Sequence, residues 1–229
     1  MSPPARPGPP APRWSLAGWL LWRPGGVEPA VALPTYGASQ AGAVLRYRLA
    51  DPPAAPAVYL RAAAALASAP GARSDAGLAL GIGQRPFAML PLRAQLEARA
   101  DRLGNGQVRA RAAAMAITEL PPLPLPGRGH AELYAQAGYV AGEAATAFVD
   151  AALRLEHPLA LVGPATLHAG AALSGGAQRG AGRVDLGPAM ALVLDHGPLH
   201  ARAALEYRVR VAGQARPGTG PALTITAGF

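Results

Sequence analysis

Residues 92–101 read LRAQLEARAD, and apolar and polar side chains alternate through the whole stretch. Leu or Ala occupies every second position, and the residues between them are Arg, Gln, Glu, Arg and Asp. Successive side chains of a β-strand point to opposite faces, so this pattern predicts a strand with one apolar face and one charged face. A helix over the same residues would spread the polar side chains around its circumference.

The same alternation recurs in 41–49, 131–139 and 199–211. Segments of about ten alternating residues, separated by turn residues, are typical of transmembrane β-barrels. Asn105-Gly106 lies between two such segments and predicts a tight hairpin. The predicted fold class is all-β, an antiparallel transmembrane β-barrel of about 12 strands. We expect these strands at 14–23, 40–50, 56–66, 75–84, 90–103, 107–118, 129–140, 147–156, 164–174, 182–194, 199–211 and 220–229.

A helical interpretation competes with the barrel in three Ala-rich segments, 60–67, 109–116 and 145–156, because Ala has the highest helix propensity. A soluble β-rich or α/β binding domain is therefore an alternative. The charged faces that alternate with apolar ones in several segments favour strands.

Composition narrows the function classes. Charged residues make up 15% of the chain, against about 25% in ordinary soluble domains. There is no cysteine, which excludes disulfides and thiolate metal sites. The formal net charge is +8, but the arginines are scattered and form no basic run, so nucleic-acid binding is not predicted.

The sequence predicts two regions: a disordered Pro-rich tail over 1–13 and a β-barrel over 14–229. Residues 1–26 contain arginines and a short apolar run but no small-residue cleavage site, so no signal peptide is predicted. An outer-membrane barrel needs an export signal. We therefore expect that this start is internal to a longer protein, or that the barrel prediction fails.

The chain ends GPALTITAGF, in which Leu223, Ile225, Ala227 and Phe229 share one apolar face. A terminal Phe that closes an alternating strand resembles the C-terminal assembly signal of Gram-negative outer-membrane barrels. The further stretches that carry the resemblance are SQAGAVLRYRL (39–49), YAQAGYV (134–140), RVDLGPAMAL (183–192) and EYRVRVAGQARPGTGPALTITAGF (206–229).

These stretches resemble the C-terminal barrel regions of uncharacterised outer-membrane proteins. More distantly, they resemble the barrels that end cellulose-export proteins and phage-adsorption proteins. The resemblance implies a location in the bacterial outer membrane. It also implies outer-membrane lipid and the barrel-assembly machinery as partners, and an assembly signal at Leu223, Ile225 and Phe229.

In a barrel, the face opposite the lipid lines the interior, where charge is tolerated if it is hydrated or paired. Two interpretations remain for this face: a lumen filled with structural ion pairs, or a basic interior that favours anions or an acidic polysaccharide. The leading hypothesis is a channel or an envelope or exopolysaccharide export component, and a non-transporting structural or adhesion barrel is the alternative. The predicted lumen-lining residues are Arg46, Arg48, Arg93, Glu97, Arg99, Asp101, Arg109, Arg111, Glu132, Arg202, Glu206, Arg208 and Arg210.

The sequence carries no catalytic motif. Ser39 and Ser174 stand at segment ends, and the chain lacks the G-x-S-x-G of a nucleophile elbow. His196 and His200 have a spacing that can serve a metal on a helix, but Gly197-Pro198 between them predicts a solvated hairpin. We therefore expect no enzyme activity, no cofactor and no metal.

Overall fold

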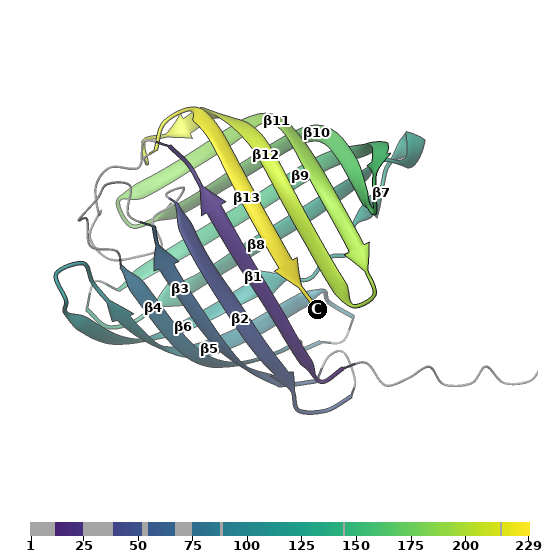
Figure 1. Ribbon diagram of the computed structural model, residues 1–229. Helices are drawn as coiled ribbons and strands as arrows, with labels where there is room; N and C mark the ends of the chain where they lie inside the picture. The colour runs from purple at the N-terminus through teal and green to yellow at the C-terminus, as the bar shows by residue number, and fades with distance from the viewer. Residues whose placement is uncertain are drawn as a thin grey trace, which may run out of the picture.

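The computed structural model describes residues 12–24, 39–51, 55–66, 75–87, 89–143, 145–215 and 217–229. In these residues, twelve long strands form one antiparallel sheet that closes into a barrel (Figure 1). They are β1 (Trp14–Trp22), β2 (Gln40–Arg48), β3 (Ala57–Ala65), β4 (Ala76–Gln84), β5 (Leu92–Arg102), β6 (Val108–Thr118), β8 (His130–Val140), β9 (Thr146–Val162), β10 (Ala165–Gln178), β11 (Ala181–His196), β12 (Leu199–Gly213) and β13 (Gly220–Gly228).

Strands that are neighbours in sequence are neighbours in the sheet. Pairing of β1 with β13 and of β6 with β8 closes the barrel. A short strand, β7 (Leu123–Pro124), pairs with the start of β8 and is followed by the 3-10 turn η1 (Pro126–Arg128). The predicted all-β barrel of about 12 strands is confirmed, whereas β7 was not predicted.

The two ends of the barrel are named here by their connections. The near end holds the C-terminus and the hairpins β9–β10 and β11–β12, and the far end holds the connections β5–β6, β10–β11 and β12–β13. Of the predicted tail 1–13, residues 1–11 lie outside the described part of the chain.

Strand β9 extends six residues past its predicted end, because it continues through Pro158 to Val162. Proline has no N–H for a sheet hydrogen bond and is normally found at edges or bulges. Here the β9–β10 register shifts: Leu167 lies opposite Ala160 and His168 lies opposite Pro158. The bulge accommodates the proline and lets the strand continue.

The hairpin predicted at Asn105-Gly106 is confirmed. Leu103 N donates to Gln107 O at 2.8 Å, and Gln107 N donates to the Asn105 side-chain oxygen at 3.0 Å. Gly106 has φ 87°, a conformation that L side chains rarely adopt. The Asn-Gly pair therefore fixes the register of β5 against β6.

The outer surface of the barrel is apolar. Leu80 is 65% exposed and Leu96 is 61% exposed, whereas the inward neighbour Glu97 is 4% exposed. Soluble monomers rarely expose contiguous apolar patches larger than a few hundred Å². An apolar exterior on every long strand matches the lipid-facing band of a membrane barrel.

The tryptophans of β1 divide between the two faces. Trp14 and Trp22, at opposite ends of the strand, are about half exposed on the outside, and the Trp14 ring lies 4.7 Å from that of Tyr47. Aromatic side chains at both membrane interfaces are typical of outer-membrane barrels. Trp19 points inward and its ring lies against Gly42, the residue opposite it on β2. A Cβ added at Gly42 would overlap this ring.

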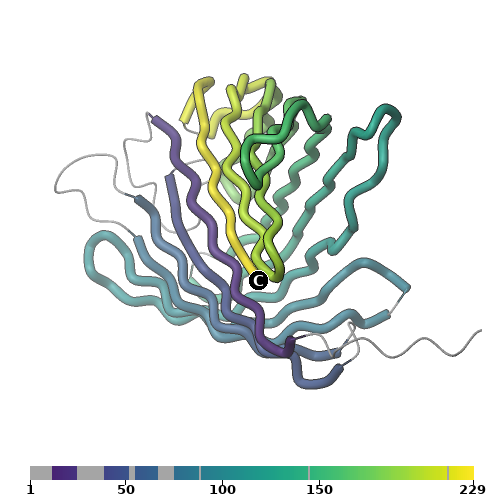
Figure 2. The backbone as a smooth tube through the Cα atoms, turned by 45° about the vertical axis from the view of Figure 1, so that its right-hand side comes forward, coloured from purple at the N-terminus to yellow at the C-terminus, as the bar shows by residue number. Residues whose placement is uncertain are grey.

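The wall of the barrel is uneven. Strands β1 to β6 have 9 to 11 residues, whereas β9 to β12 have 14 to 17. Figure 2 shows the side of the barrel formed by β1 to β6 (purple to teal) and the side formed by β9 to β12 (green to yellow). No helix in the described ranges is long and apolar enough to cross a membrane.

Candidate functional site

Strand alternation places the charged side chains inside the barrel. In β5, Arg93, Gln95 and Glu97 are buried, and the apolar residues between them face outward. Every charged residue that the sequence analysis assigned to the lumen occupies the inward face of its strand, as the register of the neighbouring strands shows. What these residues do in the lumen stays a prediction.

One group surrounds Glu97 on β5, whose side chain is 1% exposed. Tyr59 donates a hydrogen bond to Glu97 Oε2 at 3.0 Å, Arg61 binds Oε1 at 2.6 Å, and Arg99 also binds this carboxylate. An added Cβ at Gly81 would overlap the Tyr59 ring, so the glycine lets the ring lie across β4. Three donors on one carboxylate make this a closed network.

Two further groups lie at opposite ends of β6. The Asp101 carboxylate accepts a hydrogen bond from Arg111 Nε at 3.0 Å. Just beyond the end of β6, Glu119 accepts hydrogen bonds from Arg93 Nε at 2.5 Å and Arg85 Nε at 2.6 Å. Burial raises the pKa of Glu119, but these hydrogen bonds and charges outweigh it and hold the pKa below its ordinary value.

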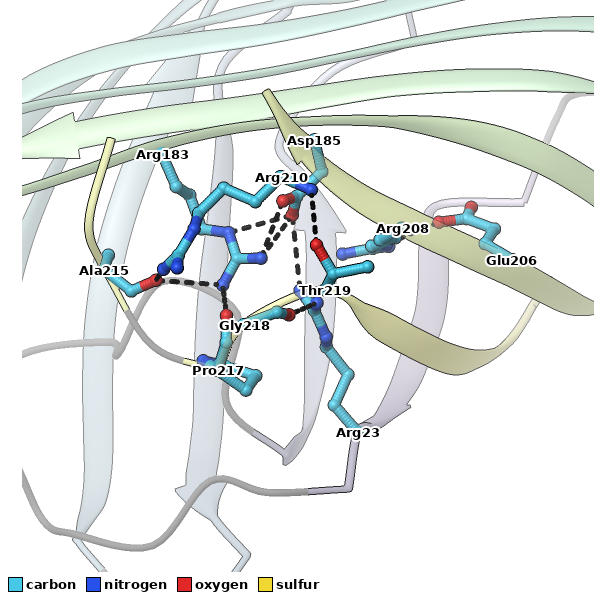
Figure 3. Close-up of polar contacts among 10 residues, drawn as sticks. All are labelled: Arg23, Arg183, Asp185, Glu206, Arg208, Arg210, Ala215, Pro217, Gly218 and Thr219. Carbon is cyan, nitrogen blue, oxygen red and sulfur yellow. Dashed lines mark hydrogen bonds and ion pairs between the residues drawn. The ribbon is translucent and has the colours of Figure 1, made fainter. Parts of the chain in front are cut away.

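At the far end, two arginines from distant parts of the chain, Arg23 and Arg183, meet at Asp185 (Figure 3). Asp185 Oδ2 lies 2.6 Å from Arg183 Nη2 and 3.3 Å from Arg23 Nη1, and all three side chains are at most 4% exposed. Arg183 also donates to Pro217 O at 2.7 Å and Arg23 donates to Gly218 O at 2.9 Å. These bonds hold the β12–β13 connection against the mouth of the barrel.

Toward the near end, a group on β8, β9, β10 and β12 surrounds Glu156, whose side chain is 2% exposed. Arg202 binds both carboxylate oxygens, one of them at 2.8 Å. His130 Nε2 lies 3.7 Å from Glu156 Oε2 and 3.7 Å from Glu132 Oε1. The His168 ring stands edge-on to that of His130, with centroids 5.3 Å apart.

A cavity of about 260 Å³ opens beside this group, at the seam between β6 and β8. These two strands share only five registered pairs, from Ala113–Val140 to Ile117–Gln136, and then diverge. The cavity is lined by Thr118, Glu119, Leu120, Pro122, Glu132, Leu133, Tyr134 and Arg154.

On the inward face, arginines outnumber carboxylates. Four arginines have a buried nitrogen with no hydrogen-bond partner among the described residues: Arg46 Nε, Arg93 Nη1, Arg111 Nη1 and Arg154 Nε. Guanidinium groups favour carboxylate and phosphate partners. The interior therefore presents positive charge with unused donors.

Sequence reasoning missed several members of these groups. Arg61, Arg154 and Asp185 alternate with apolar neighbours, so the period-2 test could have found them. Arg23 follows β1, and no local pattern marks it. His130, Glu156 and His168 stand in three separate segments, and only the strand register brings them together.

The proposed assembly-signal residues lie on the outer face of β13, where Ile225 is 40% and Phe229 is 53% exposed. Phe229 and Leu16 exchange backbone hydrogen bonds of 3.0 and 3.1 Å, which close the barrel at the near end. Their role in assembly stays a prediction. His196 and His200 flank the predicted hairpin, and His200 Nδ1 lies 2.7 Å from Asp195 Oδ1.

No protein-family model matches the chain, and no curated protein matches it. Among solved structures, the β domain of the Bordetella autotransporter BrkA is 14% identical with a TM-score of 0.44, covering 94% of this chain and 97% of that one. LpxR from Salmonella typhimurium is 13% identical with a TM-score of 0.48, covering 94% and 99%. A bacterial polysaccharide outer membrane secretin is 10% identical with a TM-score of 0.42, covering 94% and 96%.

The closed barrel with an apolar exterior and a charged interior has the architecture of a transmembrane β-barrel. The assignment of this class rests on the strand pairing and the outer surface described above.

The prediction that the chain is not an enzyme is contradicted. The barrels it resembles in architecture include an outer-membrane enzyme, LpxR. This architecture therefore does not decide between an enzyme and a non-enzyme.

Proposed function

We propose that this barrel is an anion-preferring pore that serves export of acidic material across the outer membrane. The observation that carries the proposal is the surplus of inward-facing arginine, with buried guanidinium nitrogens left unpartnered, among the described residues, at Arg46, Arg93, Arg111 and Arg154. Pore selectivity follows the charge and the hydrogen-bond donors that line the passage.

The physical basis is local charge in a confined space. A cleft lined by one sign of charge focuses the field and concentrates ions of the opposite sign. Arginines that bind Glu97, Asp185 or Glu156 are neutralised by those carboxylates. Arg93, Arg111 and Arg154 also pair with carboxylates through their guanidinium groups. Among the four arginines named above, Arg46 has no ion pair with a described carboxylate, so its charge supplies the field for anions.

Planar-bilayer conductance in a salt gradient tests the proposal. The refolded chain should conduct, and its reversal potential should have the sign of anion preference. Arg46→Glu should shift the reversal potential toward cations. Arg102→Glu is the matched control, because Arg102 is exposed on the outward face of β5 and should leave selectivity unchanged. Cation preference of the unmodified pore would overturn the proposal.

A second measurement tests whether the pore accepts acidic material. A soluble polyuronate should block the current at concentrations where a neutral dextran of similar size does not, because the arginine-lined interior binds carboxylates. Equal block by both polymers would show that size alone governs entry and would remove the argument for acidic cargo.

A further inference from the structure

We propose that His130, Glu156 and His168 form a binding site for one divalent transition-metal ion, such as Zn²⁺, inside the barrel. One potential ligand atom from each residue lies within 4.8 Å of the other two. The residues belong to three consecutive strands, β8, β9 and β10. The backbone register fixes their relative positions, with His130 opposite Glu156 and Glu156 opposite Gly170.

No hydrogen bond joins His130, Glu156 and His168 to one another, although the three groups lie close together. His130 Nε2 and Glu156 Oε2 are 3.7 Å apart, beyond hydrogen-bond distance. His168 Nδ1 is buried and has no hydrogen-bond partner among the described residues. A buried polar atom without a partner is costly and calls for a bound group. Two imidazoles and a carboxylate facing one another are a set of ligands for a metal ion.

The spacing suits a tetrahedral ion. Zinc binds imidazole nitrogen and carboxylate oxygen at about 2.0–2.2 Å, which places neighbouring ligand atoms about 3.3 Å apart. The observed separations exceed this only by amounts that side-chain rotation can supply. Three protein ligands with a free position is the arrangement of catalytic zinc sites. A further carboxylate oxygen, Glu132 Oε1, lies 3.7 Å from His130 Nε2.

A neighbouring arginine orients the Glu156 carboxylate. Arg202 donates to both oxygens of Glu156, which fixes the orientation of the carboxylate. Each carboxylate oxygen has a second lone pair that remains free for a metal. Outer partners that hydrogen-bond to a ligating carboxylate are a regular feature of metal sites. Arg202 is therefore a positioning residue in this proposal.

The ligand types select the class of metal. Ca²⁺ and Mg²⁺ prefer oxygen ligands, whereas imidazole suits zinc, copper, iron and nickel. Glu132, whose carboxylate lies 3.7 Å from His130 Nε2, also lines the 260 Å³ cavity at the β6–β8 seam. This inference does not depend on the proposed pore function.

The test uses the whole chain, without a histidine tag, refolded in detergent and titrated calorimetrically with Zn²⁺. Co²⁺ serves as a spectroscopic probe, because its visible absorption reports the coordination geometry. We expect one ion per chain, a visible Co²⁺ band, and weak or no response to Ca²⁺. His130→Ala and His168→Ala should each weaken Zn²⁺ binding at least tenfold.

His200→Ala is the matched control, because His200 lies on the exposed β11–β12 hairpin. This variant should bind Zn²⁺ as tightly as the unmodified chain does. Heat-modifiable gel migration checks that each variant folds. Arg202→Lys should fold and bind more weakly than the unmodified chain. The proposal is overturned if the unmodified chain binds no Zn²⁺, or if His130→Ala and His168→Ala bind it as tightly as His200→Ala does.

Discussion

Glu97 and Glu156 are both buried glutamates on the inward face of long strands, but their partners differ. Glu97 is bound by Tyr59, Arg61 and Arg99, so its carboxylate is enclosed by donors. Glu156 is held by Arg202 on one side and faces His130 at 3.7 Å on the other. The first arrangement is complete without a ligand, and the second leaves His168 Nδ1 without a hydrogen-bond partner among the described residues. This difference separates charge that supports the wall from charge that is available for binding.

Removal of Glu97 should have the largest effect on stability. Glu97→Ala leaves Arg61 and Arg99 without their shared carboxylate, and breaking a buried ion pair costs about 3–5 kcal/mol. We expect a matching loss in the free energy of unfolding, measured by urea titration in detergent. Tyr59→Phe, which removes one hydrogen bond, should cost about 1–2 kcal/mol. A loss below about 1 kcal/mol for Glu97→Ala would contradict the closed-network interpretation.

In the Glu156 group, removal of a side chain should change the stability little, and added Zn²⁺ should increase it. His168→Ala removes a side chain whose Nδ1 has no partner in the described part of the chain, so we expect a change below about 1 kcal/mol in metal-free protein. Added Zn²⁺ should stabilise the unmodified chain by mass action and should not stabilise His168→Ala. Urea titrations with and without Zn²⁺ measure both effects. If His168→Ala is as damaging as Glu97→Ala without metal, the contrast between the two groups disappears.

The pH dependence of stability tests a third carboxylate, Glu119, which lies just beyond the end of β6. Its pKa is lowered in the folded protein, so the stability it contributes is present above the unfolded value of about 4.3 and is lost as pH falls through the lower folded value. Urea titrations at pH 7 and pH 3 should show a smaller loss of stability on acidification for Glu119→Gln than for the unmodified chain. Identical losses would mean that Arg85 and Arg93 do not stabilise this carboxylate.

The alternation in 92–101, repeated in 41–49, 131–139 and 199–211, predicted the strands, because a period of two assigns each side chain to a face before any contact is known. It also placed Glu97, Arg99 and Asp101 on the inward face. Strand lengths were harder, since the extension of β9 depends on a bulge at Pro158 that no periodicity reveals. The pairing of particular charges was not predictable either. Arg202 and Glu156 are 46 residues apart and meet only after the barrel closes.

The central claim is that the apolar faces contact lipid and the charged faces line an aqueous interior. The chain has no cysteine, so single cysteines can be placed without background. In lipid vesicles, a water-soluble thiol reagent should react with Arg208→Cys and Arg210→Cys and not with Tyr207→Cys or Val209→Cys. A polarity-sensitive fluorophore on the same four variants should report an apolar environment at 207 and 209 only. Equal reactivity at all four positions, or the reverse alternation, would contradict the account.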